Sequence, residues 1–286
     1  FSVGLLIAAL LMPALMADEH EKTIHYLPMA GWERLRLDEA EFDTLQAGGA
    51  VAGENFTFVG LYGRTAFGEP AGPGLADAFH TVDILYDGGW KRNQLLFLFK
   101  SESDQPVAGG LATFQTAAVY GYEVLAGESL TLALGGGLAL SDFGIDWPIL
   151  PVPFVRLNLE TSLIAAGFDF ITGPNFSFTL LPENRIRLRG DMRADQFRDI
   201  RDLVFEGALE YRLCAPDGPV GDMVGIAAGI KHDLIGFSDG NANEEYELDY
   251  YALFSELDLT LLTLQAGYVF DGRDRFNEDT TRARGD

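Results

Sequence analysis

The chain has 286 residues and a formal net charge of −23, with 20 Lys and Arg against 43 Asp and Glu. This acidity argues against nucleic acid as a partner, because such binding depends on neutralising phosphates with basic side chains. The length fits one large all-β domain or two ordinary domains. No linker divides the chain, and the single cysteine, Cys214, excludes an intrachain disulfide bond.

Residues 1–17 are predicted to be a secretory signal peptide that is incomplete at its N-terminus. The segment is apolar and ends at Ala17, a small residue that precedes Asp18, as the apolar core and cleavage site of such a peptide do. It has no initiating Met and no basic region, so we expect it to start inside a longer precursor. An N-terminal anchor helix is the alternative, although 17 residues are few for a membrane span.

Residues 18–54 are predicted to be a periplasmic leader. They do not follow the alternation of apolar and polar residues that begins at about Asn55. Within them, Glu33 to Gln46 has the composition of a short helix, and the Gly-rich residues 47–53 lead into the first predicted strand.

From Asn55 to Phe270 the chain alternates with a period of two, which places successive side chains on opposite faces of a strand. In residues 203–213, for example, Leu209 and Tyr211 alternate with Glu210 and Arg212. Thirteen segments have this character, and they cover 55–64, 79–87, 90–100, 111–124, 129–140, 154–161, 163–171, 175–181, 185–192, 203–213, 223–236, 246–257 and 259–270.

Single-chain bacterial barrels have an even number of strands, so thirteen segments require one correction. We expect 163–171 and 175–181 to form one long strand bent at Gly173-Pro174, since Gly and Pro inside a strand mark kinks. This gives about twelve strands. A further strand beyond the C-terminus is the alternative and gives fourteen, and residues 271–286 are predicted to be a polar tail.

The predicted fold is a closed antiparallel up-and-down transmembrane β-barrel over residues 55–270. In such a barrel apolar side chains face lipid and polar ones face the lumen, the reverse of a soluble barrel. The apparent export signal and the many ions on the polar face favour the membrane form, because crowded interior ions need water or opposite charges. Aromatic residues near strand ends, such as Trp90, Tyr120 and Tyr122, suit a belt at headgroup depth, although ordinary strand propensity explains them as well. A soluble periplasmic β-protein is the alternative fold.

The polar face predicts which residues line the lumen. Arg185, Arg187 and Arg189 stand at alternate positions, so their side chains point the same way, and such rows can set anion preference in a pore. The predicted lumen-lining residues are Arg156, Glu160, Arg185, Arg187, Arg189, Glu206, Glu210 and Arg212. The alternative is structural: the arginines pair with these glutamates and fill a narrow barrel that need not be open.

We expect no enzymatic activity, because no set of nucleophile, base and orienting residue is visible. The adjacent His232 and Asp233 face opposite sides of a strand, so they cannot act together directly. Asp239 to Glu245 is rich in oxygen ligands, but its glycine is second and not sixth as in a helix-loop calcium site. We therefore expect neither a metal nor a cofactor.

Two stretches carry a resemblance to known proteins. Gln265 to Phe270 resembles the C-terminal signal of outer-membrane proteins, with Gly267 two residues after Gln265 and an aromatic residue three later. Residues 151–213 resemble the uncharacterised porin-like outer-membrane β-barrel proteins, in which a long bent strand passes through a proline and on to a basic strand.

The resemblance implies the outer membrane of a diderm bacterium and an architecture that allows passive passage. It implies outer-membrane lipid, the outer-membrane assembly machinery and small solutes or ions as partners, and it supplies no substrate. The function we expect is that of a porin-like passive channel for small solutes. A closed structural or surface-interaction barrel without transport activity is the alternative.

Overall fold

The computed structural model describes residues 2–8, 24–36, 41–67, 78–105, 113–141, 148–171, 173–194, 203–213, 224–239, 244–259, 262–276 and 280–284. In these ranges the chain is all-β, and its strands belong to a single sheet. The strands are β1 (Ser2–Ala8), β2 (His25–Arg36), β3 (Glu41–Gly53), β4 (Phe56–Phe67), β5 (Ala78–Trp90), β6 (Asn93–Ser103), β7 (Phe114–Ala126), β8 (Leu130–Leu140), β9 (Ile149–Glu160), β10 (Ile164–Phe170), β11 (Pro174–Leu180), β12 (Ile186–Ala194), β13 (Leu203–Arg212), β14 (Val224–Asp239), β15 (Glu244–Leu259), β16 (Leu262–Phe276) and β17 (Thr280–Arg284).

The strands follow one another in up-and-down order. Each strand from β2 to β16 pairs antiparallel with the next one in the chain. β1 pairs antiparallel with both β2 and β16. The prediction of an all-β, antiparallel, up-and-down sheet is therefore confirmed.

The two ends of the strands differ in their connections. Between β3 and β4, and between β5 and β6, only two residues intervene; three do so between β7 and β8 and between β9 and β10, and five between β11 and β12. We call this the turn end, although eleven residues separate β13 from β14 there. The opposite end, where ten residues separate β4 from β5 and β6 from β7, is called the loop end.

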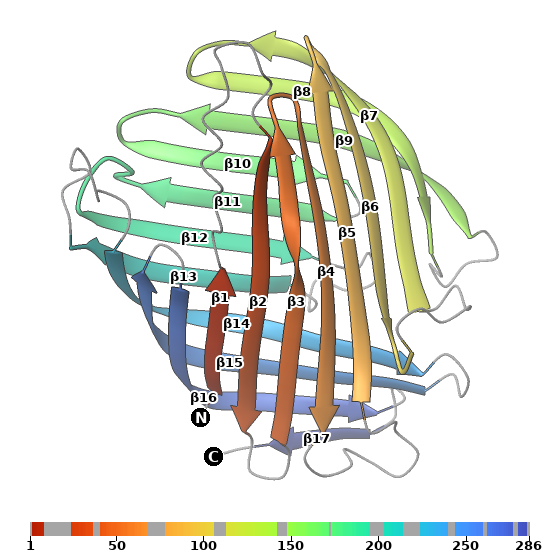
Figure 1. Ribbon diagram of the computed structural model, residues 1–286, viewed down its shortest axis with the longest axis vertical. Coiled ribbons are helices and arrows are strands. Elements are labelled where there is room, and N and C mark those ends of the chain that lie inside the picture. Colours follow the sequence, from red (N-terminus) through yellow and green to blue (C-terminus); the bar gives the residue numbers. More distant parts are fainter. Residues whose placement is uncertain are drawn as a thin grey trace.

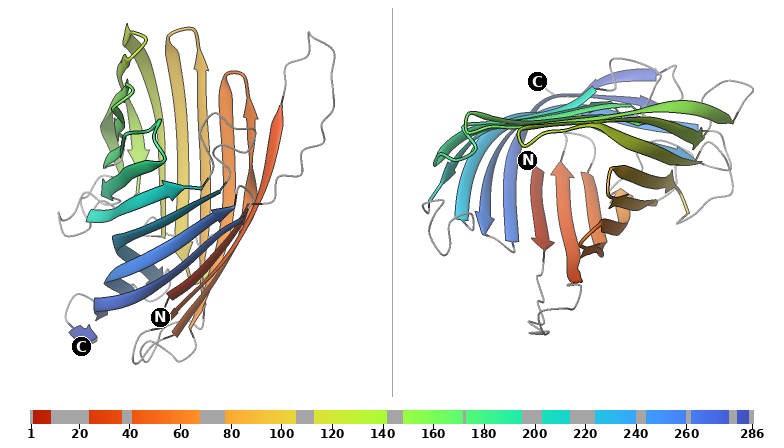
Figure 2. Two further views of the ribbon diagram at one scale, coloured as in Figure 1. Left: turned by 90° about the vertical axis from the view of Figure 1, so that its left-hand side faces the viewer. Right: turned by 90° about the horizontal axis from the view of Figure 1, so that it is seen from above.

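The sheet curls so that two parts of it face each other. In Figure 1 strands β2 to β6 run nearly upright, whereas β10 to β16 run across them at a steep angle, and Figure 2 shows both parts from the side and from above. At the loop end the two parts touch, since Ser103 on β6 forms a parallel bridge with Ser238 on β14. The inner face of the sheet is the side on which these parts meet.

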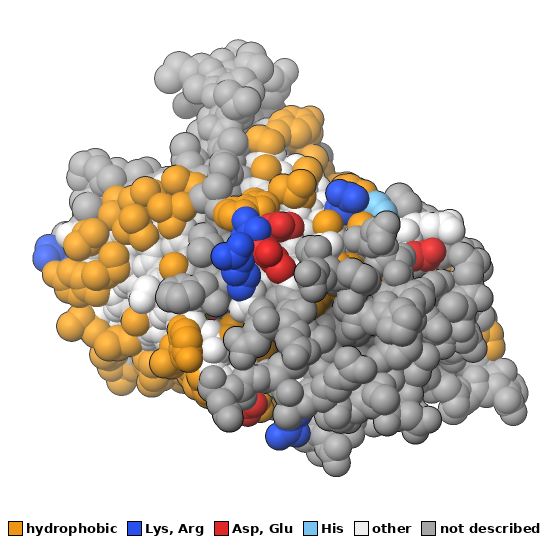
Figure 3. All heavy atoms as spheres, turned by 90° about the horizontal axis from the view of Figure 1, so that it is seen from below, with side chains coloured by type: hydrophobic (Ala, Val, Ile, Leu, Met, Phe, Trp, Pro, Cys, Tyr) orange, Lys and Arg blue, Asp and Glu red, His pale blue; other side chains and the backbone are white. Residues whose placement is uncertain are grey.

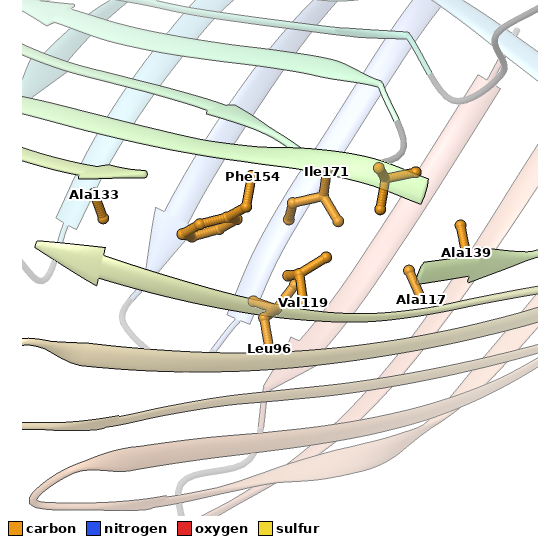
Figure 4. Close-up of a cluster of buried hydrophobic side chains, with 8 residues drawn as sticks. Leu96, Ala117, Val119, Ala133, Ala139, Phe154 and Ile171 are labelled. Carbon is orange, nitrogen blue, oxygen red and sulfur yellow. The ribbon is translucent and has the colours of Figure 1, made fainter. Parts of the chain in front are cut away.

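Buried apolar side chains fill the inner face in two main places. One cluster joins β2, β3 and β5 to β15 at the loop end, and its fully buried members include Phe42, Phe79 and Tyr250. A second cluster covers the inner face of β6 to β9, where Leu96, Val119 and Phe154 point toward one another (Figure 4). Apolar groups from opposing walls therefore occupy part of the interior.

The thirteen segments predicted between Asn55 and Phe270 all form strands, β4 to β16. In the described part of the chain, however, the sheet has seventeen strands and not about twelve or fourteen. β2 and β3 lie inside the range predicted to be a leader, and Glu33 to Gln46 contains strand and no helix in its described residues. Their inward apolar residues, Leu35 and Phe42, are widely spaced, so the alternation is weak there. Ser2–Ala8, in the predicted signal peptide, forms β1, and Thr280–Arg284, in the predicted tail, forms β17; residues 9–17 and Cys214 lie outside the described residues.

The predicted bent strand at Gly173-Pro174 is wrong. Residues 164–170 and 174–180 are two strands, β10 and β11, that pair antiparallel with Phe170 opposite Pro174. Pro174 stands at the first position of β11, where a missing backbone N–H is tolerated. The Gly-Pro pair therefore lies where the chain reverses between two strands, and not inside one strand.

Candidate lumenal site

The alternation predicted from the sequence sorts side chains between the two faces of the sheet. On β13, Ala208, Glu210 and Arg212 are buried on the inner face, whereas Leu209 and Tyr211 are exposed on the outer face. On β8, Leu134 and Leu138 are 43% and 58% exposed, while Ala133 and Ala139 are buried. Large apolar groups thus cover the outer face, and the ionic groups of β12 to β16 lie inside. In the view of Figure 3, hydrophobic side chains cover wide areas of the described surface and the charged ones gather in small groups.

Three of the predicted lumenal residues form one group. Arg187 on β12 stands directly opposite Glu210 on β13 in the strand register. Arg187 Nη2 donates a hydrogen bond to Glu210 Oε1, and Arg212 Nε lies 3.7 Å from the same oxygen. Since these side chains are largely buried, the glutamate is the counter-charge for two guanidinium groups.

Arg189 belongs to a second group, whose members lie on the four strands β12, β13, β15 and β16. Arg189 Nη2 donates to Glu206 Oε1 at 3.2 Å and to Glu256 Oε1 at 2.7 Å. Gln265 on β16 donates to the other oxygen of Glu256 at 3.5 Å. The arginine is thus held by two carboxylates, one of which the sequence did not single out.

A third ionic group joins the two facing parts of the sheet. Lys231 Nζ on β14 lies 3.8 Å from Glu33 Oε1 on β2 and 3.6 Å from Asp233 Oδ2. The hydroxyl of Tyr250 donates to Asp233 Oδ2 at 3.2 Å. This group borders the apolar cluster at the loop end, to which Tyr250 also belongs.

The remaining predicted residues lie apart from these groups. Arg156 on β9 pairs with Asp87 on β5 at 2.8 Å and not with Glu160, whose side chain is exposed at the end of β9. Arg185 is exposed in the turn before β12, and its carbonyl accepts a hydrogen bond from Arg212 N at 2.8 Å. The predicted row of three arginines is therefore divided: Arg187 and Arg189 have inward partners, and Arg185 sits at the rim.

A cavity of about 630 Å³ lies between β3 to β7 on one side and β9 to β12 on the other. Its lining mixes polar and apolar side chains, and the charged ones are Asp83, Asp87, Lys100, Glu102, Arg156, Asp169 and Arg193. Of the predicted lumenal residues, only Arg156 lines it.

The partners Asp87, Glu33 and Glu256 were missed because each stands on a strand distant in sequence from its arginine or lysine. Glu256 alternates with apolar neighbours on β15, so the period of two places it on the inner face. Which residue it pairs with depends on how strongly the sheet curls, and no sequence signal gives the curvature of the sheet.

Two histidines in the described ranges, His80 and His232, form contacts with neighbouring residues. His80 Nδ1 lies 2.6 Å from Tyr62 Oη, and His232 Nδ1 lies 2.6 Å from the carbonyl oxygen of Leu203. His232 is stacked on Tyr251 with ring centroids 4.4 Å apart. Among the described residues there is no group of three or more His, Cys, Asp or Glu placed to hold a metal ion. Most of the oxygen-rich segment from Asp239 to Glu245 lies outside them.

No family model, curated protein or solved structure matches the chain. The described part of the chain contains no helix that is long and apolar enough to cross a membrane.

Proposed function

We propose that the chain is an outer-membrane β-barrel that passes small solutes passively. The observation that carries this proposal is how side chains are distributed between the two faces of the sheet. Large apolar side chains are exposed on the outer face, and paired ions lie on the inner face. Exposed contiguous apolar surface is costly in water, whereas lipid solvates it, as on the outer band of membrane barrels. Trp90, Tyr120 and Tyr122, exposed near the turn end, suit the aromatic girdle of such a band.

The pairing of β1 supports closure of the sheet into sixteen strands, β1 to β16. Because β1 is antiparallel to both β2 and β16, these two strands run in the same direction. An up-and-down barrel can close between two such strands only through an intervening antiparallel strand, which is the position of β1. Closure also leaves no unpaired edge in lipid, where each unsatisfied backbone group is expensive.

The cavity between β3 to β7 and β9 to β12 supports passage of small solutes. Its volume of about 630 Å³ and its mixed lining suit hydrated ions or molecules of a few heavy atoms. Elsewhere the inward arginines are paired with carboxylates, so the anion-selective arginine row is not the feature that supports transport. We place the turn end in the periplasm, because short turns lie on that side of outer-membrane barrels.

Conductance of the purified protein in planar lipid bilayers tests the channel. We expect small stepwise conductance events, and their absence in protein that has inserted would reject the channel. Insertion itself is checked by gel mobility: a detergent-extracted barrel migrates differently before and after heating. A chain that stays soluble without detergent would contradict the membrane assignment.

A closed barrel with a structural or surface-interaction role is the second candidate. The apolar cluster that joins β2, β3 and β5 to β15 at the loop end favours it, since packed side chains leave no path there. A protein that inserts and shifts on heating but conducts no current would support this candidate over the channel.

A further inference from the structure

The cavity extends along the strands from the loop end nearly to the turn end. At the loop end its lining includes Glu102, Asn175 and Arg193, which stand at or near the ends of β6, β11 and β12. Toward the turn end it is lined by Asp87 and Leu96, close to the end of β5 and the start of β6. A solute that entered from the loop end would therefore meet whatever side chains cross the cavity near the turn end.

A chain of hydrogen bonds crosses the interior at that place. Arg156 Nη1 on β9 donates to Asp87 Oδ2 on β5 at 2.8 Å and to Gln94 Oε1 on β6 at 3.4 Å. Gln94 Nε2 then donates to Glu123 Oε1 on β7 at 3.3 Å. Three strands separate β5 from β9 along the sheet, so the Arg156 side chain spans the concave side of the curl.

Arg156 also sets the charge of the cavity. Among the described residues, the cavity is lined by four acidic side chains, Asp83, Asp87, Glu102 and Asp169, and by three basic ones, Lys100, Arg156 and Arg193. Arg156 is the cation that neutralises Asp87 directly and acts electrostatically on Asp169. Without it, four carboxylates would face two basic groups, and the cavity would attract cations strongly.

We propose that Arg156 is the gate of this cavity, and that its contact with Asp87 both obstructs the turn end and limits the negative charge of the pathway. The solutes that fit are small neutral molecules and small cations. The inference rests on the proposed channel function, but the access of water-borne reagents to the cavity can be measured whether or not the protein conducts.

A thiol introduced by Leu98→Cys reports that access, because Leu98 lines the cavity. Cys214→Ser provides the background, and the protein is studied inserted in lipid vesicles. The rate of modification is measured with two water-soluble thiosulfonates of similar size, one carrying a trimethylammonium group and the other a sulfonate. Each reagent is added on the side of the membrane that the turn end faces, so that it must pass Arg156 and Asp87 before it reaches residue 98. Arg187→Ala is the matched control, since Arg187 is also an inward, ion-paired arginine but does not line the cavity.

We expect Arg156→Ala to raise the rate with the cationic reagent about tenfold or more, since a cleft lined by one sign of charge concentrates counter-ions to this degree. The anionic reagent should gain much less, and Arg187→Ala should leave both rates unchanged. Equal gains for the two reagents, no gain at all, or the same gain in the Arg187→Ala control would overturn the proposal. A selective gain in protein that never conducts would keep the gate and reject the channel.

Discussion

At the scale of single residues, one close packing contact on the inner face lies where Phe154 covers Gly121. A Cβ atom added to Gly121 would lie 2.3 Å from Cε1 and 2.5 Å from Cδ1 of the Phe154 ring, and this ring is itself buried. We expect Gly121→Ala to lower the free energy of unfolding by about 1–3 kcal/mol, the usual cost of overpacking a filled core. Urea unfolding of protein refolded in lipid vesicles measures this.

Gly207→Ala is the control for that prediction. Nothing lies within 4 Å of a Cβ added at Gly207, and the two substitutions restrict the unfolded chain equally. We expect the free energy of unfolding to change by less than about 0.5 kcal/mol. Equal effects of the two substitutions would mean that Phe154 does not rest on Gly121.

The buried carboxylate of Glu210 contacts two inward arginines, Arg187 and Arg212. Glu210→Gln would remove the negative charge from both contacts, and removal of one member of a buried ion pair costs about 3–5 kcal/mol. The control is Glu160→Gln. Because the side chain of Glu160 is exposed, this substitution should change the unfolding midpoint little. A midpoint that moves equally in both variants would contradict the pairing.

Which face a residue occupies could be predicted from the sequence, but its partner could not. The period of two placed Glu206, Glu210 and Arg212 on the inner face because alternation is a property of one strand. The contact of Arg156 with Asp87 joins residues 69 positions apart, and it depends on how four consecutive pairings curve. That curvature comes from packing of the whole inner face, such as Phe154 over glycine, and leaves no local signal.

At the scale of strands, the outer face of β8 distinguishes lipid from water as the surrounding solvent. Leu134 lies in the middle of β8 and is 43% exposed, whereas Leu163, in the turn between β9 and β10, is 68% exposed. If lipid covers β8, Leu134→Arg should cost about 2–4 kcal/mol, as for Arg near the midplane of a membrane barrel. The measurement is again urea unfolding in vesicles.

Leu163→Arg is the matched substitution at the end of the strands. Near the interface an arginine costs only about 0–1 kcal/mol, so this variant should unfold almost as the parent does. In a water-soluble β-protein both exposed leucines would accept arginine with little effect. Similar stability of the two variants would therefore reject the lipid-facing outer wall.

Two of the strands that sequence reasoning missed, β2 and β3, share one property. β2 and β3 carry few large apolar residues at alternate positions, and β3 contains Gly48 and Gly49, so their pattern is weak. At Gly48 an added Cβ would lie 2.0 Å from the carbonyl oxygen of Gly60 on β4. The glycines of β3 allow the backbones of neighbouring strands to approach closely, and they form no apolar face. A need for close backbone approach leaves no trace in a hydropathy pattern.

At the scale of the whole molecule, the position between β2 and β16 decides whether the sheet closes. β15 pairs along one edge of β16, so β1 and β17 both lie on its other edge, opposite residues 262–267 and 272–276. The sequence could not give this arrangement, because Ser2–Ala8 has the composition of an export signal and no alternation. Two expectations for this segment therefore conflict. Its composition predicts that it is removed on export, whereas its pairing with β2 and β16 predicts that it stays and completes the sheet.

A disulfide bond between β1 and β16 separates these two outcomes. Leu5 stands directly opposite Leu264 in the register, and opposite residues of an antiparallel pair have Cα atoms about 4.5–5.5 Å apart, within the range that a disulfide bridges. In a Cys214→Ser background, Leu5→Cys with Leu264→Cys should therefore oxidise in the membrane-assembled protein. The bond would join the two ends of the sheet into a loop of most of the chain, which migrates faster on a non-reducing denaturing gel.

The single variant Leu5→Cys, which cannot form the bond, gives the reference mobility, and intact mass shows whether residues 2–8 are present. A full-length chain with the faster mobility would support closure through β1. A full-length chain without the bond would contradict the pairing of β1 with β16. An assembled protein that lacks residues 2–8 would contradict closure by this segment. Since β2 and β16 run in the same direction, an antiparallel barrel would then need its closing strand from another segment.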